Sequence, residues 1–185
     1  MQHQNTLELT RSALAIIDMQ EAFREKIDDF TETAERIALM VQGAKLLGLP
    51  VIVTEQYPKG LGHTAVEIAG VLPTALEIIE KTTFSSCGAQ QFQSQLESTR
   101  AKQVLVCGIE AHICVNQTVH DLMARDFQVH LLTDCMTSRK QNDRKAALRK
   151  MQRSGAIPCS VEMALFELMR DAKHEQFKAI QRLIK

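Results

Sequence analysis

Three side chains that can carry out nucleophilic chemistry stand where predicted strands end or a helix begins. Asp18 ends the apolar run "ALAIID", Lys81 ends the short strand in "LEIIEKTTF", and Cys114 lies near the start of the helix "ICVNQTVHDLMARD". A nearby ammonium and a helix N-terminus both favour thiolate over thiol, and a carboxylate can accept the thiol proton. Together the three groups predict a cysteine nucleophile.

Each of these residues also has an ordinary structural interpretation. Asp18 can cap the "QEAF" turn that follows it, Lys81 can be a solvated lysine, and Cys114 can point into the helix packing. His63 and His112 fit ordinary loop residues in the same way. The choice depends on whether the fold brings the three candidate groups together.

Short apolar runs alternate with amphipathic stretches along almost the whole chain. Strands are predicted at residues 13–18, 51–56, up to about 81, 102–109, 127–135 and 156–161. Helices are predicted at residues 31–48, 89–100, 113–126, 142–155, 162–172 and 175–185. This order predicts an α/β fold of three α-β-α layers, Rossmann-like, with a mostly parallel six-stranded sheet and helices on both faces. Ligands of such folds bind at the carboxyl ends of the strands, which is the edge that carries the three candidate groups.

Two segments are predicted in more detail. In the helix at 31–48, Thr31 or Thr33 is expected to cap the first turn and Gly48 to end the last one. The helix has an apolar stripe at helical spacing, formed by Ile37, Met40, Val41, Ala44 and Leu47 or Gly48. Residues 57–74 hold glycines and prolines and predict a long connection, which in compact domains often serves function.

The composition sets limits on the class of protein. A chain of 185 residues predicts a single domain over 1–185, with a core at about 11–184. The 22 basic residues balance the 22 acidic residues, so we expect no nucleic-acid partner. The apolar runs are far shorter than the roughly 18 residues of a membrane span, and the first residues do not resemble a signal peptide. A cytoplasmic protein without a membrane partner is therefore expected.

The cysteines agree with a reducing compartment. Their number is odd, their spacing is wide and no CxxC pair is present; they are Cys87, Cys107, Cys114, Cys135 and Cys159. Reduced thiols are the natural state of such a set in the cytoplasm.

Three motifs in a fixed order carry a family resemblance. They are "ALAIIDMQEAF", "EKTTFSSC" and "VLVCGIEAHICVNQTVHDL", and "VHLLTDCMTSR" and "EMALFELM" continue the match. The chain resembles the isochorismatase-like (cysteine hydrolase) superfamily over roughly residues 11–184. The "GIEAH" turn and the "TEQYPKGLGHT" loop look most like the isochorismatase domain-containing proteins of that superfamily.

The resemblance implies roles for five residues. The family's Asp–Lys–Cys triad falls on Asp18, Lys81 and Cys114. A non-proline cis peptide of the family falls on the Ile109–Glu110 bond. The backbone N–H groups of Glu110 and Cys114 would then form an oxyanion hole.

The resemblance also bears on metals and on the reaction. Nicotinamidases of the superfamily bind a metal through Asp-x-His and a further His after the second strand, whereas this loop holds only His63. We therefore expect no metal and no cofactor. Isochorismatases proper cleave an enol ether without needing the cysteine, so the presence of Cys114 with Lys81 favours hydrolysis of an amide or related C–N bond. The residues expected around a small-molecule substrate are Phe23, Gln56, Tyr57 and His112.

Two alternatives and one assembly state remain open from the sequence. The chain can be a binding protein that retains the fold without turnover, or a redox-sensing thiol protein in which Cys87 or Cys135 approaches Cys114. The resemblance implies a homo-oligomer, and the apolar stretch "MALFELM" offers a surface for it, although that stretch can equally pack on the sheet.

Overall fold

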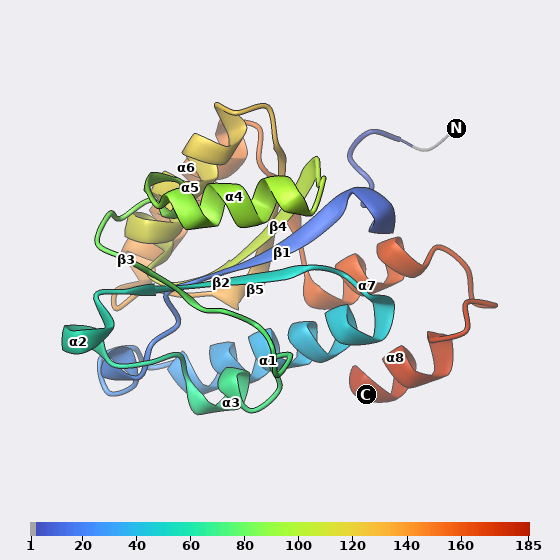
Figure 1. Ribbon diagram of the computed structural model, residues 1–185, viewed down its shortest axis with the longest axis horizontal. Helices are drawn as coiled ribbons and strands as arrows, with labels where there is room; N and C mark the ends of the chain where they lie inside the picture. The colour runs from blue at the N-terminus through green and yellow to red at the C-terminus, as the bar shows by residue number, and fades with distance from the viewer. Residues whose placement is uncertain (1–2) are drawn as a thin grey trace.

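The computed structural model describes residues 3–185 and contains a six-stranded sheet with all its strands parallel (Figure 1). The strand order is β3-β2-β1-β4-β5-β6, so the chain moves outward from the central β1 in both directions. This arrangement confirms the predicted α/β fold. The strands are β1 Ser12–Ile17, β2 Val51–Gln56, β3 Ile79–Lys81, β4 Gln103–Gly108, β5 Gln128–Met136 and β6 Ile157–Cys159.

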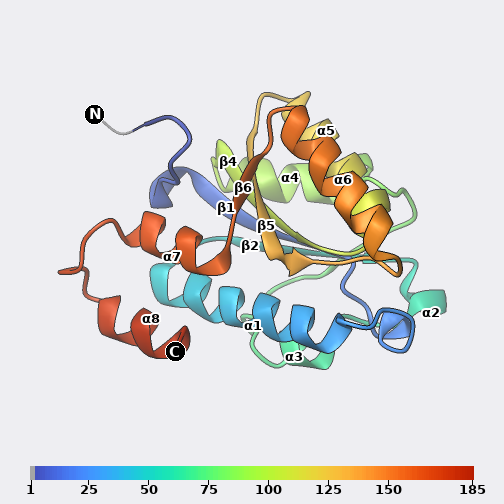
Figure 2. The same cartoon turned by 180° about the vertical axis from the view of Figure 1, so that it is seen from behind.

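Helices cover both faces of the sheet, as predicted (Figures 1 and 2). One face carries α1 Phe30–Leu47, α3 Val66–Ala69, α7 Val161–Met169 and α8 Phe177–Leu183. The other face carries α4 Gln90–Ser98, α5 Asn116–Met123 and α6 Gln141–Arg153. The short helix α2 Pro58–Leu61 lies beyond the carboxyl end of β2. No helix within residues 3–185 is both long and apolar enough to cross a bilayer.

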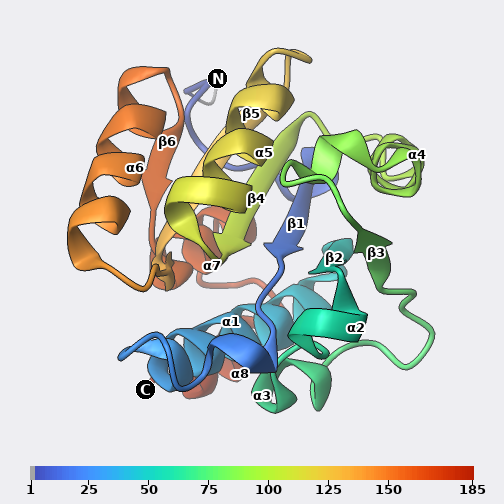
Figure 3. The ribbon, with the colours of Figure 1, turned by 90° about the vertical axis from the view of Figure 1, so that its left-hand side faces the viewer.

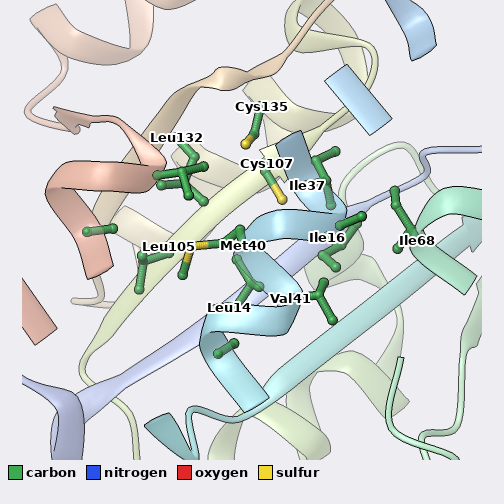
Figure 4. Close-up of a cluster of buried hydrophobic side chains, with 14 of the residues drawn as sticks. Leu14, Ile16, Ile37, Met40, Val41, Ile68, Leu105, Cys107, Leu132 and Cys135 are labelled. Atoms are coloured by element: carbon green, nitrogen blue, oxygen red, sulfur yellow. The ribbon is translucent and has the colours of Figure 1, made fainter. Parts of the chain in front are cut away.

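The hydrophobic core lies in two parts, one on each face of the sheet. Alternate residues of β1 serve the two parts: Leu14 and Ile16 pack on the α1 side, and Ala15 and Ile17 pack on the other. Figure 4 shows the α1 side, where Met40 lies beside Leu14 and Leu105. The predicted apolar stripe of α1 is buried in full.

Two details of the prediction differ from the structure. Helix α1 starts at Phe30, so Thr31 and Thr33 lie inside it and the predicted threonine cap is wrong. Asp29 is at the N-cap position, and the carbonyl of Asp29 accepts the first helical hydrogen bond from the backbone N–H of Thr33. The connection at 57–74 contains α2 and α3, which at four residues each are too short to show a periodic pattern. Gly48 does end α1, in the left-handed conformation that glycine tolerates best.

Parallel strands bring the candidate residues to one edge of the sheet, which Figure 3 views from outside. Ile17 pairs with both Thr54 and Gly108, and Gln56 pairs with Lys81. The residue after β1, the last residue of β3 and the turn after β4 therefore meet at the carboxyl edge.

Candidate active site

A buried ion pair forms the base of the site. The Nζ atom of Lys81 lies 2.6 Å from Oδ2 of Asp18, and the two side chains are 1% and 3% exposed. The hydroxyl of Thr54 donates to the other carboxylate oxygen, Oδ1, at 2.7 Å. Asp18 does not cap the following turn, since Gln20 occupies that cap position. Each oxygen of Asp18 therefore accepts a hydrogen bond from a residue of another strand, Thr54 of β2 or Lys81 of β3.

The Lys81 ammonium has further hydrogen-bond partners in addition to Asp18. It also donates to Oε1 of Gln56 at 2.8 Å and to the carbonyls of Thr83 and Phe84 at 3.1 Å each. An ammonium has three hydrogens, so these four acceptors use all of its capacity. The ammonium thereby fixes the chain that follows β3 around the site.

Cys114 lies in a π-helical turn, Ala111–Val115, that leads directly into α5. The pKa of its thiol is raised to about 12, mainly by burial; the charge of Asp18 and a hydrogen bond with Asp18 also raise it, and the charge of Lys81 lowers it. The predicted bias toward thiolate is therefore outweighed by desolvation and by the carboxylate. At neutral pH the thiol keeps its proton and lies next to a carboxylate that can receive it.

The turn between β4 and Cys114 needs a glycine at its start. Gly108 has φ +114°, and a Cβ atom there would lie 2.0 Å from the carbonyl oxygen of Ile17. A larger residue would therefore push apart the neighbouring strand ends that carry the site. In the same turn, the peptide bond between Ile109 and Glu110 is cis.

The carboxylate of Glu110 is hydrogen-bonded to the segment after β5. Its Oε1 atom accepts hydrogen bonds from the backbone N–H of Arg139 at 3.1 Å and from Nε of Arg139 at 2.9 Å. The side chain of Glu110 is 4% exposed, whereas that of Arg139 is half exposed. The charge of Glu110 is thus already compensated, which leaves Asp18 as the carboxylate nearest the thiol.

A cavity of about 110 Å³ opens beside the thiol. Its polar lining comes from Asp18, Gln56, Glu110 and Cys114, and its apolar lining from Phe23, Leu61, Phe84, Ile109 and Ile113. The structure thus brings Phe23 and Gln56, two of the residues expected around a substrate, together with the thiol. Four residues of the site were not predicted from the sequence. They are Leu61, Phe84 and Ile113, which line the cavity, and Thr54, which binds Asp18.

The other two expected substrate residues lie elsewhere. Tyr57 is exposed and lines a separate hollow of about 500 Å³ together with Lys59 and Gln90. His112 faces the segment after β5: its Nδ1 atom lies 3.1 Å from the hydroxyl of Ser138. Neither side chain lines the cavity beside Cys114.

The histidine of the long loop does not belong to a ligand cluster. His63 is exposed, and its Nδ1 atom lies 3.1 Å from Oε2 of Glu55. The other oxygen of Glu55 accepts from the backbone N–H and the hydroxyl of Thr64. Over residues 3–185 no group of three or more His, Cys, Asp or Glu side chains could hold a metal ion.

The fold and the site together define a doubly wound α/β protein in which a thiol, a carboxylate and an ammonium meet at the carboxyl edge of the sheet. The sequence model of the isochorismatase domain family matches residues 12–163. The chain belongs to the isochorismatase family, as the motifs predicted.

Named relatives agree with this assignment. Human isochorismatase domain-containing protein 2 is 44% identical over 177 residues, which cover 94% of this chain and 83% of that protein. The solved structure of a protein named MAR1 ribonuclease, from Caenorhabditis elegans, has a TM-score of 0.92 and 38% identity, and the match covers 97% of this chain and 92% of that one. The YcaC gene product of Escherichia coli has a TM-score of 0.90 at 20% identity, covers 100% and 91% of the two chains, and shows likeness of fold alone.

Proposed function

We propose that this protein is a cysteine hydrolase that cleaves an amide or related C–N bond of a small molecule through a thioester on Cys114. The observation that carries the proposal is the position of the Asp18 carboxylate, which lines the cavity with the thiol while it pairs with buried Lys81. A base held in place beside a nucleophile is the general requirement for covalent acyl transfer.

The proposed reaction has two halves. In the first, Asp18 takes the proton of the Cys114 thiol, the sulfur bonds to the substrate carbonyl carbon, and the C–N bond breaks as the amine leaves with that proton. In the second, Asp18 takes a proton from water, the hydroxide attacks the thioester, and the C–S bond breaks. The products are a carboxylic acid and the regenerated thiol, which recovers its proton from Asp18.

Lys81 and the backbone have supporting roles in this proposal. Lys81 holds the Asp18 carboxylate in place and supplies its counter-charge, since its ammonium donates to one of the carboxylate oxygens. The amides of Glu110 and Cys114 are proposed to hold the oxyanion that forms on the carbonyl. The Glu110 carboxylate is bound to Arg139, which fits a role for the Glu110 amide and not for its side chain.

The test is a screen of small amides, ureides and acyl compounds with the wild-type protein and Cys114→Ala. We expect hydrolysis of some compounds by the wild type and a loss of roughly a thousandfold or more in the variant. Rapid quenching and intact-mass spectrometry should then show an acyl adduct on Cys114. Hydrolysis that persists unchanged in Cys114→Ala would refute the nucleophile assignment.

RNA cleavage is a second candidate, because the C. elegans relative is named a ribonuclease. The features of this chain favour a small substrate: basic and acidic residues balance, and the cavity beside the thiol holds about 110 Å³. Incubation with a labelled RNA oligonucleotide discriminates the two. Cleavage that Cys114→Ala abolishes would favour the ribonuclease activity.

A binding or redox-sensing protein is the remaining alternative. Cys114 and Cys87 pack on the same face of the sheet, whereas Cys135 packs on the opposite face. Mild peroxide followed by peptide mass spectrometry would show a Cys87–Cys114 disulfide if the thiols form a redox pair. A hydrolase mechanism predicts no such bond as part of its function.

We also predict that the protein forms a homo-oligomer and that it is located in the cytoplasm. The E. coli YcaC protein is described as an octameric hydrolase of unknown specificity. On helix α7, Met163 and Phe166 are exposed large apolar side chains that an interface between copies of this chain would cover. Light scattering after gel filtration measures the oligomeric state, and cell fractionation tests the predicted cytoplasmic location.

A further inference from the structure

The charges around the cavity beside Cys114 are already paired within the protein. The Asp18 carboxylate is matched by Lys81, and the Glu110 carboxylate by Arg139. Among the described residues that line the cavity, no Lys, Arg or His is present. No unpaired cationic side chain of the cavity lining would therefore compensate the charge of a negatively charged ligand.

The small size of the cavity adds to this effect. A volume of about 110 Å³ leaves room for only a small ligand group and little accompanying water. A carboxylate that enters this space has to shed most of its hydration shell. Since five of the lining side chains are apolar, they offer no hydrogen bonds to replace that shell.

The cationic side chains around the cavity are either paired with other groups of the protein or exposed to solvent. Lys81 already donates to four acceptors, and Arg139 donates to Glu110. The ammonium of Lys26 lies over the ring of Phe23, 5.8 Å from its centre, but Lys26 is exposed to water. A solvent-exposed charge compensates a buried anion only weakly, because water and salt screen it.

We propose that the cavity beside Cys114 selects compounds that are uncharged in the part that enters it and excludes carboxylates. This inference rests on the proposed function for its biological meaning, because it makes the substrate a neutral amide or ureide and not an amide with an acidic acyl group. The selection itself is a property of the cavity and is present whether or not the protein turns over.

Phe84 is the residue through which the selection can be changed. Its side chain lines the cavity, is 56% exposed and comes from the segment whose carbonyls Lys81 holds. A lysine at this position can keep its stem on the apolar wall and its ammonium in water near the mouth. Phe84→Lys should therefore fold and supply the cation that the cavity lacks.

The test compares the alkylation of Cys114 by iodoacetamide and by iodoacetate, two reagents that differ mainly in charge. Peptide mass spectrometry gives the rate at Cys114, and 2-mercaptoethanol gives the intrinsic rate ratio of the reagents. We expect the preference for iodoacetamide at Cys114 to exceed that of free thiol by roughly tenfold or more. Phe84→Lys should reduce the excess, whereas the control Met163→Lys, on exposed helix α7, should leave it unchanged.

Three results would overturn the proposal. The first is a rate ratio at Cys114 equal to that of free thiol, and the second is a preference for iodoacetate. The third is the absence of labelling by either reagent in the folded protein while both label the unfolded chain, since the cavity would then admit neither. None of these depends on hydrolysis, so failure of the proposed function, measured with Cys114→Ala, is distinguishable from failure of this inference.

Discussion

Removal of the Lys81 ammonium should leave the carboxylate of Asp18 buried without a counter-charge. In Lys81→Met the aliphatic stem is largely kept, but the ammonium that lies 2.6 Å from Oδ2 of Asp18 is lost. The hydroxyl of Thr54 remains as a hydrogen-bond donor to that carboxylate. Breaking a buried ion pair from one side costs about 3–5 kcal/mol. Since the carbonyls of Thr83 and Phe84 also lose a donor, we expect the upper part of that range.

The pH dependence of this loss identifies its cause. Protonation of Asp18 is the simplest way for the folded variant to remove the buried charge. The folded variant therefore binds more protons than its unfolded chain, whose aspartate titrates near pH ~3.9, and its stability falls as the pH rises. The deficit relative to wild type should be small near pH 4 and should grow toward pH 7.

Urea unfolding between pH 4 and 7.5 measures this deficit. Lys150→Met, which removes an exposed lysine from α6, is the control and should stay within about 0.5 kcal/mol of wild type. The double variant Lys81→Met/Asp18→Asn should recover at least about 1 kcal/mol relative to the sum of the single changes. Asn suits this position, because residue 18 has φ +50° and asparagine tolerates that conformation. A deficit that does not vary with pH, or strictly additive single changes, would refute the reasoning.

Three further outcomes follow from single groups. Burial lowers the pKa of His130 to about 4, so on acidification the unfolded chain takes up a proton before the folded chain does. The free energy of unfolding should therefore fall by about 3 kcal/mol as the pH is lowered from ~6.5 to ~4. Urea unfolding should show no such fall in His130→Leu. With a pKa of about 12, Cys114 should react with iodoacetamide about tenfold faster per pH unit from pH 7 to 9.5, and a plateau in that range would contradict the assignment. Arg139→Leu should cost about 1–3 kcal/mol because buried Glu110 loses a donor, and a thermal midpoint equal to wild type would argue against that hydrogen bond.

The sequence predicted the architecture because its signals are strong and regular. Alternate burial in β1, the helical stripe of α1 and the glycine that ends α1 each follow from local residue types. The start of α1 was missed because Asp29, at its N-cap position, makes no side-chain cap hydrogen bond, so the local cap rule pointed to the threonines instead. Helices α2 and α3 were missed because one helical turn carries no periodicity.

The candidate site was predictable as a set of positions and not as an electrostatic environment. The rule that ligands bind at strand ends places Asp18, Lys81 and Cys114 on one edge, and the structure brings them together. The direction of the Cys114 pKa could not be obtained this way, because it depends on burial more than on neighbouring charges. Thr54 is the first polar residue after the apolar run at the start of β2, and this change of residue type is a signal that could have identified it as a partner of Asp18.

The raised pKa of Cys114 constrains how the proposed reaction can begin. A thiol with a pKa of about 12 is ionised to roughly one part in 10⁵ at pH 7, so attack by a preformed thiolate would be rare. If the proton instead moves to Asp18 as the sulfur approaches the carbonyl, the negative charge passes from carboxylate to sulfur and then to the oxyanion. The site as a whole then keeps one negative charge opposite the fixed Lys81 ammonium throughout. Burial that suppresses the free thiolate is thus compatible with a base-assisted nucleophile, and it lowers the reactivity of the resting thiol toward electrophiles in solution.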